Sequence, residues 1–203
     1  MKLTVMIWLI AIAAFLAVLA PVYAGDISGN VACKGARDSR DVVVYLADAP
    51  GQFPPPKEHA VMDQKNLEFI PRVLPVVAGT TVDFLNSDDV MHNVFSPDKD
   101  ADKFNLGSWP KGQTRSHTFE MKCDDDVCAP VVLCNVHPEM EGYVVVLKSP
   151  YFAVTDKAGS FTIKDVPAGD YHLELWHSKL KGEGAVVTVP EKGTATVILE
   201  MHR

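Results

Sequence analysis

The sequence predicts an all-β protein. Clusters of Gly, Pro, Asn and Asp recur about every 8 to 12 residues, and short runs of β-branched and apolar residues lie between them. Turn signals at this spacing are typical of a β-sandwich or a β-barrel. Beyond the first 24 residues, no stretch shows sustained helical periodicity. We therefore expect short strands throughout the mature chain.

The first 24 residues have a character of their own. Lys2 provides a positive start, residues 3–19 are almost wholly apolar, and small residues precede Gly25. These features are typical of a secretory signal peptide that is removed on export. An uncleaved membrane anchor is the alternative, although a run of about 17 residues is near the lower limit for a span. We expect a periplasmic or otherwise exported protein that meets a membrane only if the leader is uncleaved.

Three groups of strands are predicted along the mature chain. The first covers residues 26–31 and 41–46. The Pro-rich segment that follows, residues 52–57, cannot join a sheet because proline lacks the amide donor. The second group covers residues 66–70, 72–77, 81–85, 90–95, 115–121, 130–133 and 143–147, with a loop-rich segment at 96–113. The third covers residues 152–156, 159–163, 171–176, 185–189 and 195–201, with a turn at 166–169.

The chain is acidic. Its formal charge of −7 becomes −8 once the leader, which carries one Lys and no acid, is removed. Such a domain binds nucleic acid poorly, because contacts to phosphates need Lys and Arg. The charge fits a basic protein partner met in transient encounters. The sequence also lacks a serine–histidine–acid set, a phosphate-binding glycine loop and a zinc-protease helix motif, so we do not expect an enzyme.

Four cysteines are present, at positions 33, 123, 128 and 134. An exported chain meets an oxidising compartment, where disulfides persist. Cys123 and Cys128 bracket a short polar segment, and a hairpin of that size brings two cysteines within bridging distance. With Cys134 set aside for metal, Cys33 would then be a buried free thiol. The alternative is that Cys33, Cys123 and Cys128 are all unpaired structural cysteines.

The stretch that carries chemistry is Cys-Asn-Val-His-Pro-Glu-Met at residues 134–140. It places a thiolate, an imidazole and a thioether in one loop, and a second imidazole, His92, follows the Thr-Val-x-Phe-x-Asn strand upstream. Soft sulfur ligands with imidazole suit copper, and a His₂Cys site with a weak axial Met is the arrangement of blue-copper centres. Zinc could occupy the same ligands and would make the site structural. Either metal requires His92 to fold back onto this loop.

These motifs resemble the cupredoxins of the plastocyanin and pseudoazurin type over roughly residues 60–147. The likeness is carried by residues 71–86, by His-Asn-Val-Phe at 92–95, by Cys-x₂-His-x₂-Met at 134–140 and by Gly-Tyr-Val-Val-Val at 142–146. It implies a Greek-key β-barrel or sandwich. It also implies a ligand set and a hydrogen-bonding neighbour of the thiolate: His92, Cys134 and His137 as equatorial ligands, Met140 as the axial ligand, and Asn93 beside the sulfur.

One departure from the family pattern concerns the loop length. Plastocyanin-like loops usually have four residues between the last His and the Met, whereas here only Pro138 and Glu139 separate His137 from Met140. The shorter spacing occurs in the binuclear copper domain of cytochrome oxidase, which needs two cysteines separated by three residues. Five residues separate Cys128 from Cys134. We therefore expect one copper ion.

The flanking segments resemble a carboxypeptidase regulatory-like, transthyretin-like β-sandwich. Residues 27–31 with 42–46, and the Thr-Asp-Lys-Ala-Gly-Ser-Phe-Thr-Ile and Val-Pro-Ala-Gly-Asp-Tyr motifs within residues 152–171, carry this likeness. Such modules run directly from the first strand pair to this hairpin, whereas here the cupredoxin-like segment intervenes. We predict a signal peptide at 1–24, a discontinuous sandwich at 25–51 and 148–203, and a copper domain at 52–147 inserted in it. In the tandem alternative, the N-terminal strands belong to the cupredoxin.

These observations predict an exported, monomeric copper protein that carries single electrons between redox partners, such as a cytochrome or an oxidase domain. In the family the electron passes through the Cys-loop His, which here is His137, and Pro138 and Met140 would form an apolar docking rim. Copper trafficking or sensing without an electron-shuttle role is the second hypothesis. The third is a structural exported β-protein whose site is vestigial or zinc-filled.

Overall fold

The computed structural model describes residues 23–123 and 125–203. The predicted signal peptide therefore lies, but for its last two residues, outside the described part of the chain. Every regular element within the described residues is a β-strand, as the turn spacing predicts. No helix in these residues is long and apolar enough to cross a membrane.

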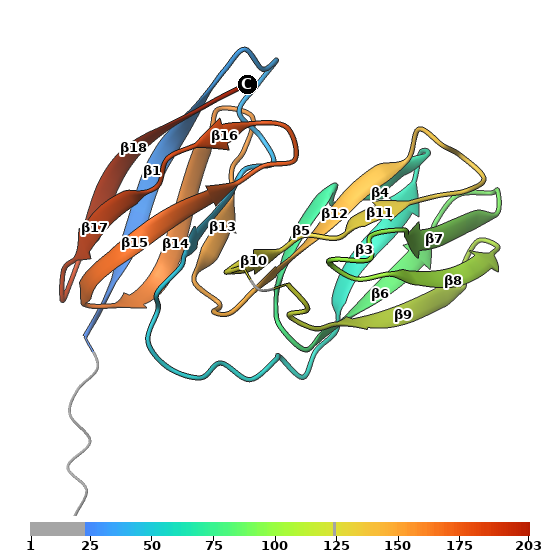
Figure 1. The fold of residues 1–203 in the computed structure, drawn as a ribbon, viewed down its shortest axis with the longest axis horizontal. Coiled ribbons are helices and arrows are strands. Elements are labelled where there is room, and N and C mark those ends of the chain that lie inside the picture. The colour runs from blue at the N-terminus through green and yellow to red at the C-terminus, as the bar shows by residue number, and fades with distance from the viewer. Residues whose placement is uncertain (1–22, 124) are drawn as a thin grey trace, which may run out of the picture.

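Two four-stranded sheets form a sandwich from the two ends of the chain (Figure 1). The first sheet has the order β14-β1-β18-β16, and the second has the order β13-β2-β15-β17. Their inner faces enclose one apolar core, which includes Ile27, Val44, Ile163 and Leu173. The strands of the sandwich are β1 (Ala24–Lys34), β2 (Val43–Leu46), β13 (Phe152–Val154), β14 (Ser160–Pro167), β15 (Gly169–Trp176), β16 (Lys181–Gly182), β17 (Ala185–Val189) and β18 (Thr194–His202).

The middle of the chain forms two further sheets, which enclose a second core. One has the order β4-β3-β6-β9; the other has the order β10-β12-β11-β7-β8, with β5 paired to β12. The strands are β3 (Ala60–Lys65), β4 (Glu68–Ile70), β5 (Val73–Val77), β6 (Thr80–Asn86), β7 (His92–Ser96), β8 (Phe104–Trp109), β9 (Thr114–Phe119), β10 (Val127–Cys128), β11 (Val131–Leu133) and β12 (Glu141–Leu147).

Strand pairing joins the N-terminal segment to the C-terminal one. β1 runs antiparallel to β14 and parallel to β18, and β2 lies between β13 and β15. Neither β1 nor β2 pairs with a strand of residues 60–147 in the described part of the chain. Because the tandem alternative needs such pairs, we keep the discontinuous division, with the copper domain at 52–147, as our proposal.

Strand β12 belongs to two cores at once, because alternate side chains of a strand point to opposite faces. Val144 and Val146 face the core of the middle unit. Val145 and Leu147 face the sandwich, where they form a buried cluster with Val43 of β2. The two units are therefore packed against each other through apolar side chains.

Besides the two-residue strands β10 and β16, which lie outside the predicted ranges, three strands depart from the predicted pattern. β3 was not predicted, because Asp63, Gln64 and Lys65 make it polar; its parallel pairing with β6 supplies the ladder that the local sequence does not indicate. β8 lies within the segment expected to be loop-rich, as an edge strand with a register irregularity where it pairs with β7. β14 continues to Pro167, into the predicted turn at 166–169.

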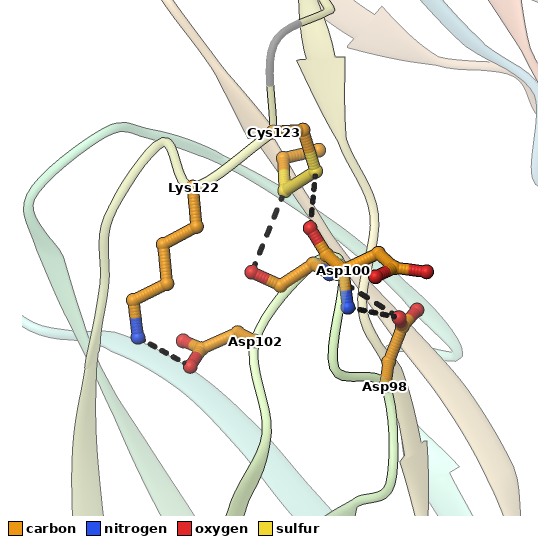
Figure 2. Close-up of a disulfide and its surroundings, with 7 residues drawn as sticks. Asp98, Asp100, Asp102, Lys122 and Cys123 are labelled. Carbon is orange, nitrogen blue, oxygen red and sulfur yellow. Dashed lines mark hydrogen bonds and ion pairs between the residues drawn. A yellow bond between two sulfur atoms is a disulfide. The ribbon is translucent and has the colours of Figure 1, made fainter.

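The cysteines follow one prediction and depart from another. Cys123 and Cys128 form a disulfide with a Cα–Cα distance of 5.4 Å, so the predicted pair is confirmed (Figure 2). Cys33 is a free thiol, but it is partly exposed rather than buried. Three acidic residues, Asp98, Asp100 and Asp102, lie near this disulfide (Figure 2). Of these, Asp102 is buried and bonded to Lys122 at 2.6 Å and to His117 at 2.9 Å.

Truncation of Leu147 tests the packing between the two units. Leu147 is buried in the shared cluster, so Leu147→Ala should lower the free energy of unfolding by about 2–5 kcal/mol, measured by urea denaturation. Ile198→Ala is the control, because Ile198 is 81% exposed on the sandwich and its truncation should change stability by less than about 0.5 kcal/mol. Equal, small losses from the two variants would contradict the packing.

Candidate metal centre

Three neighbouring strands bring the predicted ligands together. Cys134 directly follows β11, His92 opens β7, and Met140 directly precedes β12. Leu133, the last residue of β11, pairs with Phe95 of β7 and with Glu141 of β12, both antiparallel. Because the end of one strand lies beside the start of its antiparallel neighbours, the ligand positions meet where these three strands end, on one side of the sheet. His92 therefore folds back onto the Cys134 loop.

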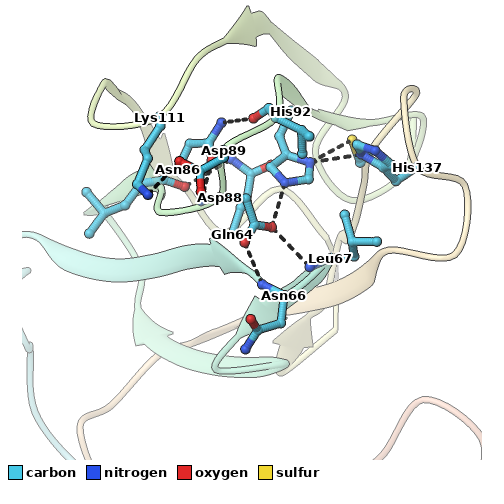
Figure 3. Close-up of polar contacts among 12 residues, drawn as sticks. Gln64, Asn66, Leu67, Asn86, Asp88, Asp89, His92, Lys111 and His137 are labelled. Carbon is cyan, nitrogen blue, oxygen red and sulfur yellow. Dashed lines mark hydrogen bonds and ion pairs between the residues drawn. The ribbon is translucent and has the colours of Figure 1, made fainter.

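The donor atoms of His92, Cys134 and His137 all lie within 4.8 Å of one another. His92 Nδ1 is 3.0 Å from His137 Nδ1 and 3.8 Å from Cys134 Sγ (Figure 3). His92 and Cys134 are buried, whereas His137 is partly exposed. Two imidazole nitrogens and one sulfur therefore lie close together beneath the surface, with His137 on the solvent side.

This donor set fits a soft metal ion. A metal bound to imidazole nitrogen at about 2.0 Å and to thiolate sulfur at about 2.3 Å separates those ligand atoms by roughly 3.3–3.8 Å. The His92–Cys134 distance of 3.8 Å lies at the upper end of this range, the His92–His137 distance of 3.0 Å lies slightly below it, and the His137–Cys134 pair lies within 4.8 Å. His₂Cys is also the equatorial set that copper electron-transfer sites use. The residues present therefore suit copper, with His92, Cys134 and His137 as the groups that would hold it.

Asn93 connects the thiol to the neighbouring strand. Its backbone amide donates to Cys134 Sγ at 3.4 Å, and its side-chain oxygen accepts from the Asn135 amide at 3.4 Å. Its side-chain nitrogen donates to Asn105 Oδ1 at 3.0 Å and to the Gly107 carbonyl at 2.8 Å, both on β8. The role expected of Asn93, a hydrogen bond beside the sulfur, thus has its donor in the main chain.

Met140 lies in the same apolar core as Cys134. Its backbone amide donates to the His137 carbonyl at 3.0 Å, which closes the two-residue loop between them. Only 1% of Met140 is exposed, so the prediction that it forms part of an apolar docking rim is wrong. Pro138 is exposed. Axial ligation by Met140 stays a prediction.

Sequence reasoning missed the residue that contacts the far side of His92. Asp88 Oδ2 is 2.9 Å from His92 Nε2 (Figure 3). Burial by itself raises the pKa of Asp88, but hydrogen bonds from the Leu67 amide, from His92 and from the Asn66 amide outweigh it and lower the pKa below its ordinary value. The only signal in the sequence was an acid four positions before a candidate ligand. Metal-binding histidines commonly donate their other ring nitrogen to such a group.

Arg72, which precedes β5 of the middle unit, links the end of the ligand loop to the sandwich. Its guanidinium is bonded to Glu141, which follows Met140 directly, at 2.6 Å. It also lies 3.8 Å from Asp41, which precedes β2 of the sandwich. Because these side chains stay about a quarter to a third exposed to solvent, which screens their charges, the two ion pairs contribute modestly to stability. Their effect is to hold the second half of the ligand loop against the neighbouring unit.

Exposed apolar side chains precede both histidines of the cluster in the chain. Val90 and Met91 directly precede His92, and Val136 precedes His137. Each of the three is about half exposed. Isolated exposed apolar residues are ordinary on protein surfaces, but these three stand directly before the two histidines of the cluster in the chain. We call these three residues the apolar rim.

Comparison with known proteins gives partial matches. A search of curated protein sequences finds no match. A family model described as polysaccharide lyase family 4, domain II, matches residues 144–197. This segment runs from β12 into β18 and covers most of the C-terminal part of the sandwich. It is less than half of the chain.

Several solved structures are similar to part of this chain. A Cu-containing nitrite reductase (NirK) from Thermus scotoductus SA-01 is 20% identical over 59% of this chain and 28% of its own, with a TM-score of 0.41. A purple cupredoxin from Nitrosopumilus maritimus is 26% identical over 43% of this chain and 98% of its own, with a TM-score of 0.36. A reduced amicyanin variant is 24% identical over 51% and 97%, with a TM-score of 0.38. The match thus spans under a third of the nitrite reductase chain but nearly all of each cupredoxin.

Replacement of the thiol tests the ligand set. Cys134→Ala should abolish the intense visible charge-transfer band expected on addition of Cu(II), because the band requires a thiolate ligand. Cys33→Ala is the matched control and should leave the band unchanged, since Cys33 lies on β1 of the sandwich. Absorption spectra of the two variants at equal copper loading decide the matter. A band that survives in Cys134→Ala would exclude Cys134 as a ligand.

Proposed function

We propose that this chain is an exported, mononuclear copper protein that carries single electrons between redox partners and converts no substrate. The observation that carries the proposal is the cluster of His92, Cys134 and His137, in which His92 Nδ1 lies 3.0 Å from His137 Nδ1 and 3.8 Å from Cys134 Sγ. When bound, copper supplies a one-electron exchange between its two common oxidation states. A role outside the cytoplasm is supported by the Cys123–Cys128 disulfide, because disulfides persist in oxidising compartments.

The protein's own contribution is a rigid, mostly dry set of ligands. Backbone pairing among β7, β11 and β12 holds the segments that carry the ligands next to one another. The Asn93 amide donates to the sulfur, and burial of His92 and Cys134 keeps water from them. Ligands that are held in place rearrange little when the metal charge changes, which favours rapid electron exchange.

The geometry supports His137 as the residue through which the electron passes between the metal and a partner protein. It is the one member of the cluster that reaches solvent, while His92 and Cys134 are enclosed. The apolar rim of Val90, Met91 and Val136 is exposed and adjoins His92 and His137 in the chain. A partner seated on it would displace water from apolar surface, which favours association without requiring a permanent complex. The acidic charge of the chain favours a basic cytochrome or oxidase domain as that partner.

Copper trafficking is the second candidate, and one observation favours it. Met91 is half exposed directly beside His92, and thioethers are soft ligands that suit Cu(I). An exposed thioether next to a buried site could receive the ion from a donor protein. This function needs reversible Cu(I) loading but no reduction potential within the range of a redox partner.

Copper titration of the purified chain separates the two functions. Electron transfer predicts an intense visible band with Cu(II) that bleaches on reduction and returns on reoxidation through many cycles, because the thiolate and imidazoles serve both oxidation states. The same sample should exchange electrons with a basic cytochrome in stopped-flow mixing. A colourless protein that binds only Cu(I) would support trafficking, and a protein that binds Zn(II) alone would exclude both.

A charge placed on the apolar rim tests the docking surface. Val90→Lys should slow the second-order reaction with a basic cytochrome by about tenfold or more at low salt, through repulsion and lost apolar contact. Ile198→Lys makes the same charge change on an exposed apolar residue of β18 in the sandwich. Its effect should be much smaller, and both variants should keep the wild-type visible band. Equal slowing by the two variants would exclude the rim as the docking surface.

A further inference from the structure

The carboxylate of Asp88 contacts three N–H groups, one of which belongs to the candidate ligand His92. Oδ1 accepts from the Asn66 amide at 2.7 Å, and Oδ2 accepts from the Leu67 amide at 3.0 Å. Oδ2 also lies 2.9 Å from His92 Nε2. The His92 side chain is fully buried, and that of Asp88 is 15% exposed. An ionised carboxylate can only accept hydrogen bonds, so this contact places a proton on His92 Nε2 and leaves the lone pair of the neutral ring on Nδ1.

The lone pair of His92 consequently faces the cluster. Nδ1 is the atom that lies 3.0 Å from His137 Nδ1 and 3.8 Å from Cys134 Sγ. The two ring nitrogens thus have separate tasks, one as a donor to Asp88 and the other as a ligand. The hydrogen bond of the first sets the tautomer and the ring orientation of the second.

The turn between β3 and β4 is shaped to hold this carboxylate. Asn66 and Leu67 have φ angles of +56° and +60°, a region that a bulky residue such as Leu rarely adopts. This conformation directs both of their amides at Asp88, as Figure 3 shows. Backbone held in a rarely populated region persists where the surroundings determine it, and such positions gather at functional sites.

We propose that Asp88 is a positioning residue of the metal centre: it fixes His92 with Nδ1 toward the other ligands, and its charge favours Cu(II) over Cu(I). The charge acts because a carboxylate partner increases the donor strength of the imidazole. The more highly charged ion gains more from a nearby negative charge. This inference rests on the proposed copper site and adds to it a residue that sets the reduction potential.

The matched pair Asp88→Asn and Asp89→Asn isolates this role. Both remove one negative charge, but Asp89 is 89% exposed, is paired with Lys111 at 2.7 Å and makes no bond to His92 (Figure 3). Asn at position 88 keeps the size of the side chain and one acceptor oxygen. It loses the charge and leaves one of the three N–H donors without an acceptor. The two variants therefore separate a general charge effect from a specific contact with His92.

For Asp88→Asn we expect the affinity for Cu(II) to fall by about 10- to 100-fold. The affinity for Cu(I) should fall by a factor about ten times smaller. That tenfold difference corresponds to a rise of about 59 mV in the potential of a one-electron couple. Competition titrations with chelators of each oxidation state, together with a redox titration of the visible band, measure both quantities. Asp89→Asn should change each by less than about twofold, since an exposed charge is largely screened. Equal shifts in the two variants, or none in Asp88→Asn, would overturn the proposal.

A measurement on the metal-free protein decides the geometry independently. Nitrogen NMR of the wild-type chain with ¹⁵N-labelled histidine should show His92 as the Nε2–H tautomer, with a proton that exchanges slowly with solvent. A wild-type His92 protonated on Nδ1 would overturn the proposal, whether or not copper binds and whether or not Asp88→Asn folds. If the expected tautomer is found but the wild-type chain gives no visible copper band, the proposed electron-transfer function fails while the positioning of His92 stands.

Discussion

The pairing of β11 with both of its neighbours is the constraint on which the candidate site depends. β11 is three residues long, yet Leu133 pairs with Phe95 on one side and with Glu141 on the other. These two pairs fix where the Cys134 loop begins and where it ends relative to His92. Since a slip of one residue would turn every side chain of the strand to the opposite face, the register of this strand decides whether the sulfur and the imidazoles meet.

The site also places polar groups in an apolar core, where each needs a partner. Asn86 is buried and donates to the carbonyls of Val90 and Trp109 at 2.9 Å each. Its side-chain oxygen accepts from the Asp88 amide. Asn86, Asp88 and Asn93 thus bind the segments on both sides of His92 to β6 and β8. Such a connected network makes the surroundings of the ligand rigid, because moving one member leaves its neighbours unsatisfied.

The sandwich does more than flank this arrangement. β12 begins directly after Met140 and buries Val145 and Leu147 against the sandwich while its other face fills the core of the middle unit. Arg72 adds a polar link from Glu141 toward Asp41. The strand that ends the ligand loop is consequently packed on both faces. A ligand loop supported in this way is well suited to keep its geometry when a redox partner docks nearby.

The amino-acid sequence by itself determined the fold class, the separate character of the flanking segments and the identity of the clustered residues. Turn spacing and β-branched runs are local signals, and the Cys-x₂-His-x₂-Met loop is short enough to be recognised as a unit. Only the tertiary structure decided that β3 and β8 are strands, that Met140 is buried, and that Asp88 and the turn at Asn66 and Leu67 contact His92. These features arise from pairing and contact between segments distant in the chain, so their free energy is absent from any local window of sequence.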